Sequence, residues 1–285
     1  MTVSDYRRGA LHPRLRPYIT AAQGYHLGGF APGIHVGMPS PALTLIVSLG
    51  ADLDVTAPGA GGARGSFSTL ASGLAATPAL IHHDGTQAGI QLALTPAGAR
   101  VLLGLPAAAL AEEVVGLHAI WGRRAAELAD RVGSAGTWEG RFAALSTFLL
   151  QVLGDRIALL PPEVDAAWNL LVGSCGQVKV ADVAREVGWS RRHLASRFHD
   201  ELGVSPKAIS SVARFDRARH LVLARPDLTL AHVAAECGYA DQAHFNREWR
   251  RMAGTSPTAW RLAESLPFVQ DVDDAAPQDQ HHGQH

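Results

Sequence analysis

Cysteine is scarce in this sequence: Cys175 and Cys237 are the two that occur among 285 residues. Two cysteines are too few for a disulfide scaffold, and no Cys-x-x-Cys or His-Glu-x-x-His motif offers a metal site. No apolar run approaches the roughly 18 residues of a membrane helix, and the residues after Met1 lack the apolar core of a secretion signal. We therefore expect a cytoplasmic protein with no metal, no cofactor and no membrane partner.

Catalytic signatures are missing as well. No Gly-x-Ser-x-Gly elbow occurs, and the glycine-rich residues 59–65 are not followed by the Lys-Ser/Thr pair of a phosphate loop, so we interpret them as a turn between strands. His82 and His83 are adjacent, and adjacent side chains on a strand point to opposite faces, which disfavours a shared metal ion. These absences argue against an enzyme.

The net charge of −1 hides an uneven distribution. Residues 1–166 hold 11 Lys/Arg and 12 Asp/Glu, residues 167–262 hold 14 and 9, and residues 263–285 hold none and 5. A segment of net charge +5 therefore lies between two acidic ones. Such a segment is the modest electrostatic footprint of a nucleic-acid-binding unit, although charged faces also serve only to solvate a protein.

In the first half of the chain, the pattern of apolar residues changes at Thr95. Between residues 44 and 94, short apolar runs alternate with breaks rich in Gly, Pro and Ala, and the runs 43–49, 52–55 and 89–94 are predicted to be strands. Thr95 can cap a helix that begins at Pro96, and residues 121–132 and 137–153 have apolar residues at helical spacing. Strands followed by helices are thus expected in this half.

Pro161 and Pro162 mark a boundary before a predicted helix at residues 163–172. We expect an α+β protein: an N-terminal strand-rich domain at 1–160 and a C-terminal all-helical domain at 161–265. Residues 266–285 are acidic and rich in Gln and His without an apolar period, which predicts a disordered tail.

The C-terminal third matches itself at an offset of 50 to 51 residues, which is the most specific signal in the chain. Residues 181–189 align with residues 231–239, and the match continues to two Ser-Pro pairs, at Ser205 and at Ser256. Each copy contains two short apolar stripes at helical spacing. One supersecondary unit of two helices therefore occurs twice.

The turn of each copy has the residues of a helix-turn-helix motif. Gly188 and Gly238 follow the first helix, where a left-handed backbone is needed, and Ser190 and Asp241 stand where the second helix needs a cap. In this motif the second helix places its N-terminal residues against base edges in the major groove. Cys237 aligns with Val187, which predicts a packed thiol without chemistry.

The two second helices offer side chains that suit DNA, because Arg can reach guanine, Gln and Asn can reach adenine, and further Arg can neutralise phosphates. The alternative to DNA binding is that these residues form ordinary solvent-exposed helix faces. The candidate DNA-binding residues are Arg191, Arg192, His193, Ala195, Ser196, Arg197, Gln242, His244, Asn246, Arg247 and Arg250.

An uninterrupted helical pattern at Pro206–Ala224 joins the copies, with Arg214, Arg217 and Arg219 expected on its exposed side. At about 1.5 Å per residue this helix is a rod of roughly 28 Å. Such a rod can hold two reading helices about one DNA turn, roughly 34 Å, apart. One chain is thus expected to occupy two successive major grooves.

Residues 178–261 resemble the DNA-binding domain of the AraC/XylS family of bacterial transcription regulators. The resemblance rests on residues 183–190, on the linker-helix run 211–219, and above all on residues 233–249 with the Gly-Thr-Ser-Pro of 254–257. It implies base contacts from two sets of three residues, namely Arg192, Ala195 and Ser196 in the first motif and Gln242, His244 and Arg247 in the second. Ala195 and Ser196 are short where many members have longer polar chains, so the first helix is expected to depend more on its arginines.

The resemblance further implies that the N-terminal half is a sensor domain, with a small β-barrel as one option, that it senses a small molecule, forms a dimer, or does both, and that the regulator meets RNA polymerase. No ligand motif emerges from spacing alone. Candidates for a pocket are His26, His35, His118 and Trp121, although such residues are more often ordinary partly buried ones. The apolar stripe of helix 137–153 (Phe142, Leu145, Phe148, Leu149 and Val152) either completes the core or meets a second subunit.

We therefore predict a sequence-specific DNA-binding transcription regulator. An enzyme with an appended DNA-binding domain is one alternative, and DNA-repair methyltransferases show that combination, but residues 1–174 contain no acceptor cysteine. An interaction module that has lost DNA binding is the other alternative. It predicts eroded basic faces, whereas Arg191, Arg192 and Arg247 are present.

Overall fold

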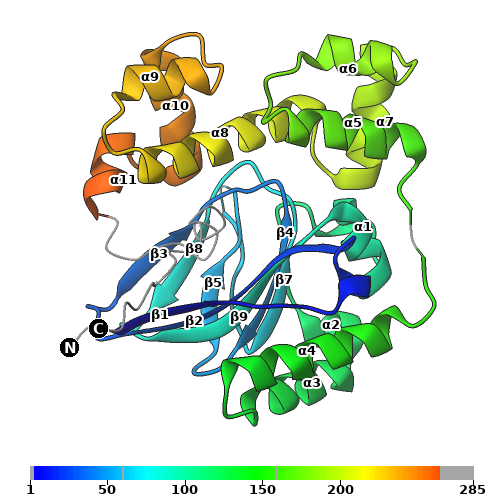
Figure 1. Ribbon diagram of the computed structural model, residues 1–285, viewed down its shortest axis with the longest axis vertical. Coiled ribbons are helices and arrows are strands. Elements are labelled where there is room, and N and C mark those ends of the chain that lie inside the picture. Colours follow the sequence, from blue (N-terminus) through cyan, green and yellow to red (C-terminus); the bar gives the residue numbers. More distant parts are fainter. Residues whose placement is uncertain (1–2, 60, 158, 264–285) are drawn as a thin grey trace, which may run out of the picture.

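A computed structural model describes residues 3–59, 61–157 and 159–263 of the chain (Figure 1). The predicted disordered tail at 266–285 lies outside the described residues. Nine strands precede the first α-helix, a tenth short strand lies among the helical elements that follow, and a bundle made of helices alone comes last. The α+β class and the order of strands before helices are confirmed.

The strands form two antiparallel sheets, one of six strands in the order β1-β2-β9-β4-β7-β10 and one of four in the order β3-β8-β5-β6. The six-stranded sheet consists of β1 (Val3–Arg8), β2 (Ile19–Gly28), β4 (Leu43–Ser48), β7 (Thr69–Ser72), β9 (Gln87–Leu94) and β10 (Val114–Gly116). The four-stranded sheet consists of β3 (Gly33–Gly37), β5 (Leu53–Thr56), β6 (Arg64–Phe67) and β8 (Ala79–His83).

The small β-barrel that the sequence left as an option is wrong. The edge strands β1 and β10 pair with neighbours in their own sheet, as do β3 and β6, so no ladder among the described residues closes the sheets into a barrel. The chain repeatedly leaves one sheet for the other, as at Gly28–Gly33 and at the Pro-rich residues 38–42. The strands therefore form two stacked layers and not one continuous sheet.

Strand β4 shows why two layers form. Leu43, Leu45 and Val47 point to one face and join the main hydrophobic cluster, whereas Ile46 points to the other face and packs with Leu53 of the four-stranded sheet. Side chains alternate with a period of two, so one apolar strand supplies both layers at once. The six-stranded sheet is thus covered on one face by helices and on the other by the second sheet.

Helical elements follow β9 and pack on the main cluster. Thr95 caps α1, as predicted, by accepting a 3.0 Å hydrogen bond from the amide of Gly98. The helix predicted at 121–132 is observed but begins two residues later, at Arg123, because Gly122 has a φ of +58° and separates it from a preceding helix that ends at Trp121. The elements are α1 (Pro96–Gly98), η2 (Ala99–Leu103), η3 (Ala107–Leu110), α2 (Leu117–Trp121), α3 (Arg123–Gly133) and α4 (Trp138–Leu153).

The apolar stripe of α4 is part of the core. Phe142, Leu145, Phe148, Leu149 and Val152 are each at most 6% exposed within the single chain. Because the protomer already covers them, these side chains offer no surface to a second copy. Of the two roles left open by the sequence, core packing is the one observed.

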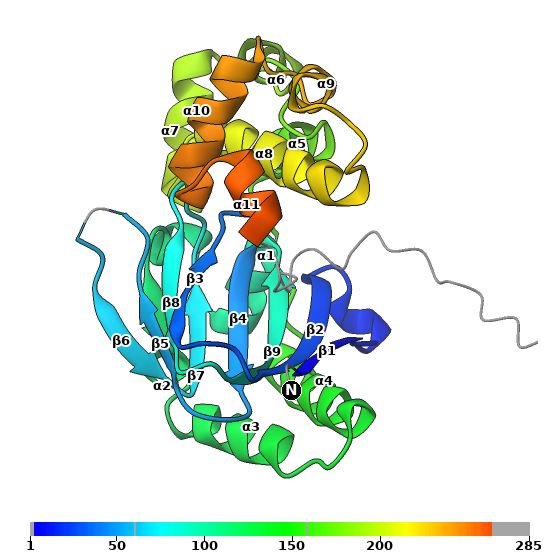
Figure 2. The ribbon, with the colours of Figure 1, turned by 90° about the vertical axis from the view of Figure 1, so that its left-hand side faces the viewer.

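The C-terminal helices lie above the strand-rich part, with α8 running across the bundle (Figures 1 and 2). They are α5 (Pro162–Gly173), α6 (Val180–Glu186), α7 (Arg191–Leu202), α8 (Pro206–Ala224), α9 (Leu230–Glu236), α10 (Gln242–Ala253) and α11 (Pro257–Ala263). Leu15 and Trp260 belong to one hydrophobic cluster, so buried contacts cross the proposed boundary near residue 160. None of the helices in the described ranges is both long and apolar enough to cross a bilayer.

Candidate nucleic-acid interface

The first helix-turn-helix consists of α6 and α7. The backbone at Gly188 has a φ of +73°, the left-handed conformation that only glycine adopts at little cost, and it ends α6 as predicted. Ser190 then caps α7 by accepting a 3.2 Å hydrogen bond from the amide of His193. This cap orients the first turn of α7, which carries three of the candidate DNA-binding side chains.

The second helix-turn-helix repeats this geometry in α9 and α10. Gly238 has a φ of +75°, and Asp241 caps α10 with a 2.6 Å hydrogen bond from the amide of His244. Cys237 is fully buried at the end of α9, and burial raises its pKa to about 11, so the group remains a protonated thiol at neutral pH. The prediction of a packed thiol is confirmed.

An aromatic edge contact supports the start of each second helix. In the first motif the rings of Trp189 and His193 have centroids 4.6 Å apart, and in the second those of Tyr239 and His244 are 5.4 Å apart, both edge-on. The aromatic residue after the turn glycine thus packs on the first turn of the following helix. The internal repeat holds at the level of individual contacts.

The candidate DNA-binding residues differ in exposure. Three of them, Arg197, His244 and Asn246, are half-buried. The exposed ones are Arg191, Arg192, His193, Ala195, Ser196, Gln242, Arg247 and Arg250. Leu194 and Phe198 on α7, and Phe245 and Trp249 on α10, are fully buried, so each helix has an apolar inner side and a polar outer side.

The linker helix α8 has the predicted bounds, but the prediction that its arginines are exposed is wrong. Arg219 is 0% exposed and donates a 2.9 Å hydrogen bond to Asp216. Arg214 is half-buried, donates a 2.8 Å hydrogen bond to the carbonyl oxygen of Gly176 and lies over the ring of Tyr239. Arg217 forms a 3.5 Å ion pair with Glu236. These arginines lie in contacts between helices because α5, α7, α9, α10 and α11 all pack against α8.

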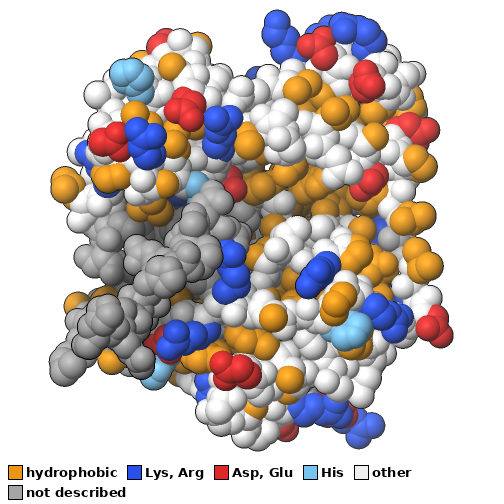
Figure 3. Space-filling model, in the orientation of Figure 1, with side chains coloured by type: hydrophobic (Ala, Val, Ile, Leu, Met, Phe, Trp, Pro, Cys, Tyr) orange, Lys and Arg blue, Asp and Glu red, His pale blue; other side chains and the backbone are white. Residues whose placement is uncertain are grey.

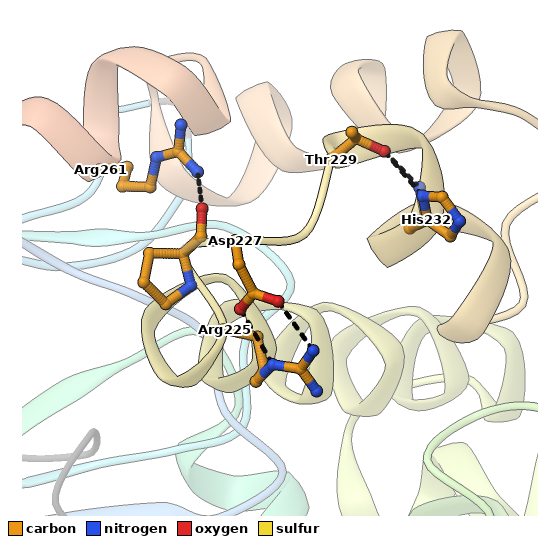
Figure 4. A network of polar contacts seen from close by, with 6 residues as sticks. Arg225, Asp227, Thr229, His232 and Arg261 are labelled. Atoms are coloured by element: carbon orange, nitrogen blue, oxygen red, sulfur yellow. Dashed lines mark hydrogen bonds and ion pairs between the residues drawn. The ribbon is translucent and has the colours of Figure 1, made fainter.

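The loop between α8 and α9 is held by polar contacts (Figure 4). Arg225 donates two hydrogen bonds, of 2.9 and 2.8 Å, to the carboxylate of Asp227, and Thr229 caps α9 through the amide of His232. Arg261 of α11 donates a 3.4 Å hydrogen bond to the carbonyl oxygen of Pro226. The direction in which the second motif leaves the linker helix is therefore defined by side chains on both sides of the loop.

Helices α7 and α10 lie toward opposite ends of α8 (Figure 1) and on the same side of it (Figure 2). In Figure 3, Lys and Arg side chains gather at the top of the molecule over the region of α6. The two polar helix faces can thus be presented in one direction.

Comparisons with known proteins agree with this geometry. A family model described as "Helix-turn-helix domain" matches residues 183–263. The Arabinose operon regulatory protein of Salmonella typhimurium is 28% identical over 147 residues, covering 47% of this chain and 52% of that protein. The HTH-type transcriptional regulator ExsA of Pseudomonas aeruginosa is 32% identical over 83 residues, covering 29% and 30% of the two chains. By these matches the helix-turn-helix domain at residues 183–263 is one of the AraC/XylS family of transcription regulators.

The chain spans about half the length of the first of these relatives and less than a third of the second. A solved structure, unsaturated fatty acid bound ToxT from Vibrio cholerae, matches with a TM-score of 0.51 at 12% identity over 92% of this chain and 97% of that one. At this identity the likeness shows the fold, and it extends to the strand-rich half. The AraC/XylS family is one of transcription regulators and not of enzymes.

The N-terminal half contacts both second helices at their C-terminal ends. Arg100 of η2 forms an ion pair with Glu201 near the end of α7, and Arg251 near the end of α10 donates to Ala76. At Gly203, which ends α7 with a φ of +73°, an added Cβ would lie 2.3 Å from the Cβ of Ala111. The N-terminal turns of both helices are left exposed.

A cavity lies between the two sheets. Of the four residues that the sequence offered for a pocket, His35 lines it. His26 lies in a separate, more open depression, His118 is exposed, and Trp121 packs on Phe148 with its indole nitrogen donating to Leu102. Tyr6, Tyr25 and Gln87 also line the cavity, and no sequence pattern pointed to them because their strands meet only in the folded chain.

His82 and His83 have separate contacts: His82 lies 3.1 Å from the hydroxyl of Thr56, and His83 accepts from the amide of Gly85. Across the described parts of the chain, no group of three or more His, Cys, Asp and Glu side chains could hold a metal ion.

Proposed function

We propose that this protein regulates transcription by reading two successive major grooves of double-stranded DNA with α7 and α10. The observation that carries the proposal is the placement of two capped helices, with exposed polar N-terminal turns, on the same side of one linker helix. The 19 residues of α8 amount to about 28 Å of helix, which is close to the roughly 34 Å of one DNA turn. Such a regulator would act in the cytoplasm, where the bacterial chromosome lies.

Within this proposal the base contacts come from the outer sides of the two helices. Arg192 on α7 and Gln242 and Arg247 on α10 are exposed and have the donors that pair with guanine or adenine. His244 is half-buried, so a base contact from this residue would involve only the exposed part of its side chain. Ala195 and Ser196 are exposed but short, so α7 would rely on Arg191 and Arg192 for much of its affinity.

The N-terminal half, at about 1–160, would act as the sensor and the helical part, at about 161–265, as the reader. The cavity between the sheets supports the sensing role, and a fatty acid bound to ToxT shows that a chain of this fold can carry a small molecule. A second copy of the chain and RNA polymerase are further proposed partners. The stripe on α4 is not the dimer surface, since it is buried.

The alternative of an interaction module without DNA binding is disfavoured by the exposed Arg191, Arg192, Arg247 and Arg250. The test is the selection of bound sites from random DNA by the full chain, with and without candidate small molecules, followed by the salt dependence of the best site. We expect two half-elements about 10–10.5 base pairs apart and a steep salt slope. Enrichment of a single half-element, or of none, would contradict reading by both helices.

A further inference from the structure

The cavity between the sheets has a volume of about 120 Å³ and walls from both layers. Ile46 and Leu70 contribute from the six-stranded sheet, and Val55 and Ile81 from the four-stranded one. These apolar side chains face each other without filling the space between them. An unfilled apolar space inside a natural domain forfeits packing energy, which a small ligand can restore.

Charged side chains do not line this cavity among the described residues. His35 is the one lining group with a pKa in the range of mild acid: burial, and secondarily the proximity of His83, lowers it to about 4, so the imidazole is neutral at pH 7. Burial also raises the pKa of Tyr25, which keeps the phenol neutral. A charged ligand would therefore lose its water here without gaining an opposite charge, at a cost that a neutral ligand avoids.

Two polar groups of the lining residues lack partners. The Nε2 atom of Gln87 on β9 and the Oγ1 atom of Thr77, just before β8, are both buried and have no hydrogen-bond partner among the described residues. A buried donor without a partner costs about 1–3 kcal/mol, so such groups call for an occupant that satisfies them. An oxygen atom on the ligand would accept from Gln87.

We propose that this cavity binds an uncharged, mainly apolar small molecule about the size of one aromatic ring, with an oxygen that accepts a hydrogen bond from Gln87. The proposal rests on the sensing role given above and names its ligand class. The size follows because an engineered apolar cavity of about 150 Å³ holds benzene. Sugars do not suit the mainly apolar walls, and long acyl chains exceed the volume and find no cation for their carboxylate.

The test compares three ring-sized probes that differ in charge: benzyl alcohol, benzylamine and benzoate. Titration of each into the full chain at pH 7.5, followed by calorimetry or ligand-observed NMR, gives the three affinities. We expect benzyl alcohol to bind at least about tenfold more tightly than either charged probe, since a buried unpaired charge costs more than the roughly 1.4 kcal/mol of a tenfold change.

Two variants place the binding in the cavity. Ala79→Leu fills the space from β8 and should abolish binding of benzyl alcohol, whereas Ala119→Leu, an equal enlargement at an exposed position of α2, should leave it unchanged. Gln87→Met keeps the shape of the side chain and removes the amide. This substitution should weaken the binding of benzyl alcohol about fivefold and leave the binding of toluene unchanged, because toluene has no oxygen to accept the hydrogen bond.

Equal or tighter binding of a charged probe would overturn the proposal, as would binding of none of the three. Binding of benzyl alcohol that persists in Ala79→Leu would place the ligand elsewhere and would also overturn it. Selection of DNA sites by the same protein is measured without any probe. If the ligand proposal fails, the DNA-site selection is unaffected, so the two proposals can fail independently of each other.

Discussion

The guanidinium of Arg251, near the C-terminal end of α10, donates a 2.9 Å hydrogen bond to the carbonyl oxygen of Ala76. Ala76 lies between β7 and β8, and its neighbours Ala75 and Thr77 line the cavity between the sheets. One wall segment of the cavity is thus bonded directly to the second reading helix. The ion pair of Arg100 with Glu201 makes a second connection, to the end of α7.

Replacing Arg251 with Met should loosen this wall segment. The loss of a hydrogen bond of roughly 1 kcal/mol predicts amide exchange at residues 73–77 that is about fivefold faster in the full chain. The matched control is Glu248→Gln, which removes the 3.6 Å ion pair of Glu248 with Arg251 and keeps the bond to Ala76. Equal exchange rates in both variants would show that the bond does not hold the segment.

Asp216→Ala should destabilise the protein by about 3 kcal/mol, because it removes the carboxylate that faces the fully buried guanidinium of Arg219. The matched control is Asp182→Ala on α6. Asp182 forms a 3.0 Å ion pair with Arg185, also three residues away, but both side chains are largely exposed, so the expected loss is less than about 1 kcal/mol. Urea unfolding of the full chain measures both variants, and similar losses would argue against a structural role for the buried pair.

Arg247→Ala should lower the affinity for the selected DNA site by about 1–3 kcal/mol and relax the choice of base at one position. Arg131→Ala, which removes the same charge from α3 in the other half of the chain, should leave the base preference unchanged. Repeating the site selection with each variant gives both quantities. An unchanged preference in Arg247→Ala would assign this side chain to a phosphate or to solvent.

Acid should weaken the fold through His35. Burial, with a smaller contribution from His83, lowers the pKa of this imidazole to about 4, while the unfolded value is near 6.5. Between these values the unfolded chain binds more protons than the folded chain, so stability is full above pH 6.5 and falls toward pH 4. The expected loss from pH 7 to pH 5 is about 2 kcal/mol.

The measurement is urea unfolding at the two pH values for the original chain and for His35→Gln. The loss assigned to His35 should disappear in His35→Gln and persist in His118→Gln, whose histidine is exposed. An equal loss in all three proteins would mean that other groups cause the acid sensitivity.

The reading half could be predicted from the sequence because its signals are local. Gly188 and Gly238 end helices by their own backbone freedom, and Ser190 and Asp241 cap helices within three residues of themselves. The internal repeat and the pattern at 206–224 predicted the arrangement of helices without any long-range contact. The roles of the exposed side chains on DNA remain predictions.

The arginines of α8 and the cavity could not be predicted in the same way. Arg219 follows the helical pattern of an exposed residue, and only the packing of other helices around α8 buries it. Tyr6 and Gln87 lie on β1 and β9 of one sheet and His35 lies on β3 of the other, so strand pairing and the stacking of the two sheets together bring them around one cavity. Short-range periodicity and caps thus determined the two helix-turn-helix motifs. Tertiary structure decided the number of sheets, the burial of charge and the ligand space, because each depends on which distant faces exclude water from one another.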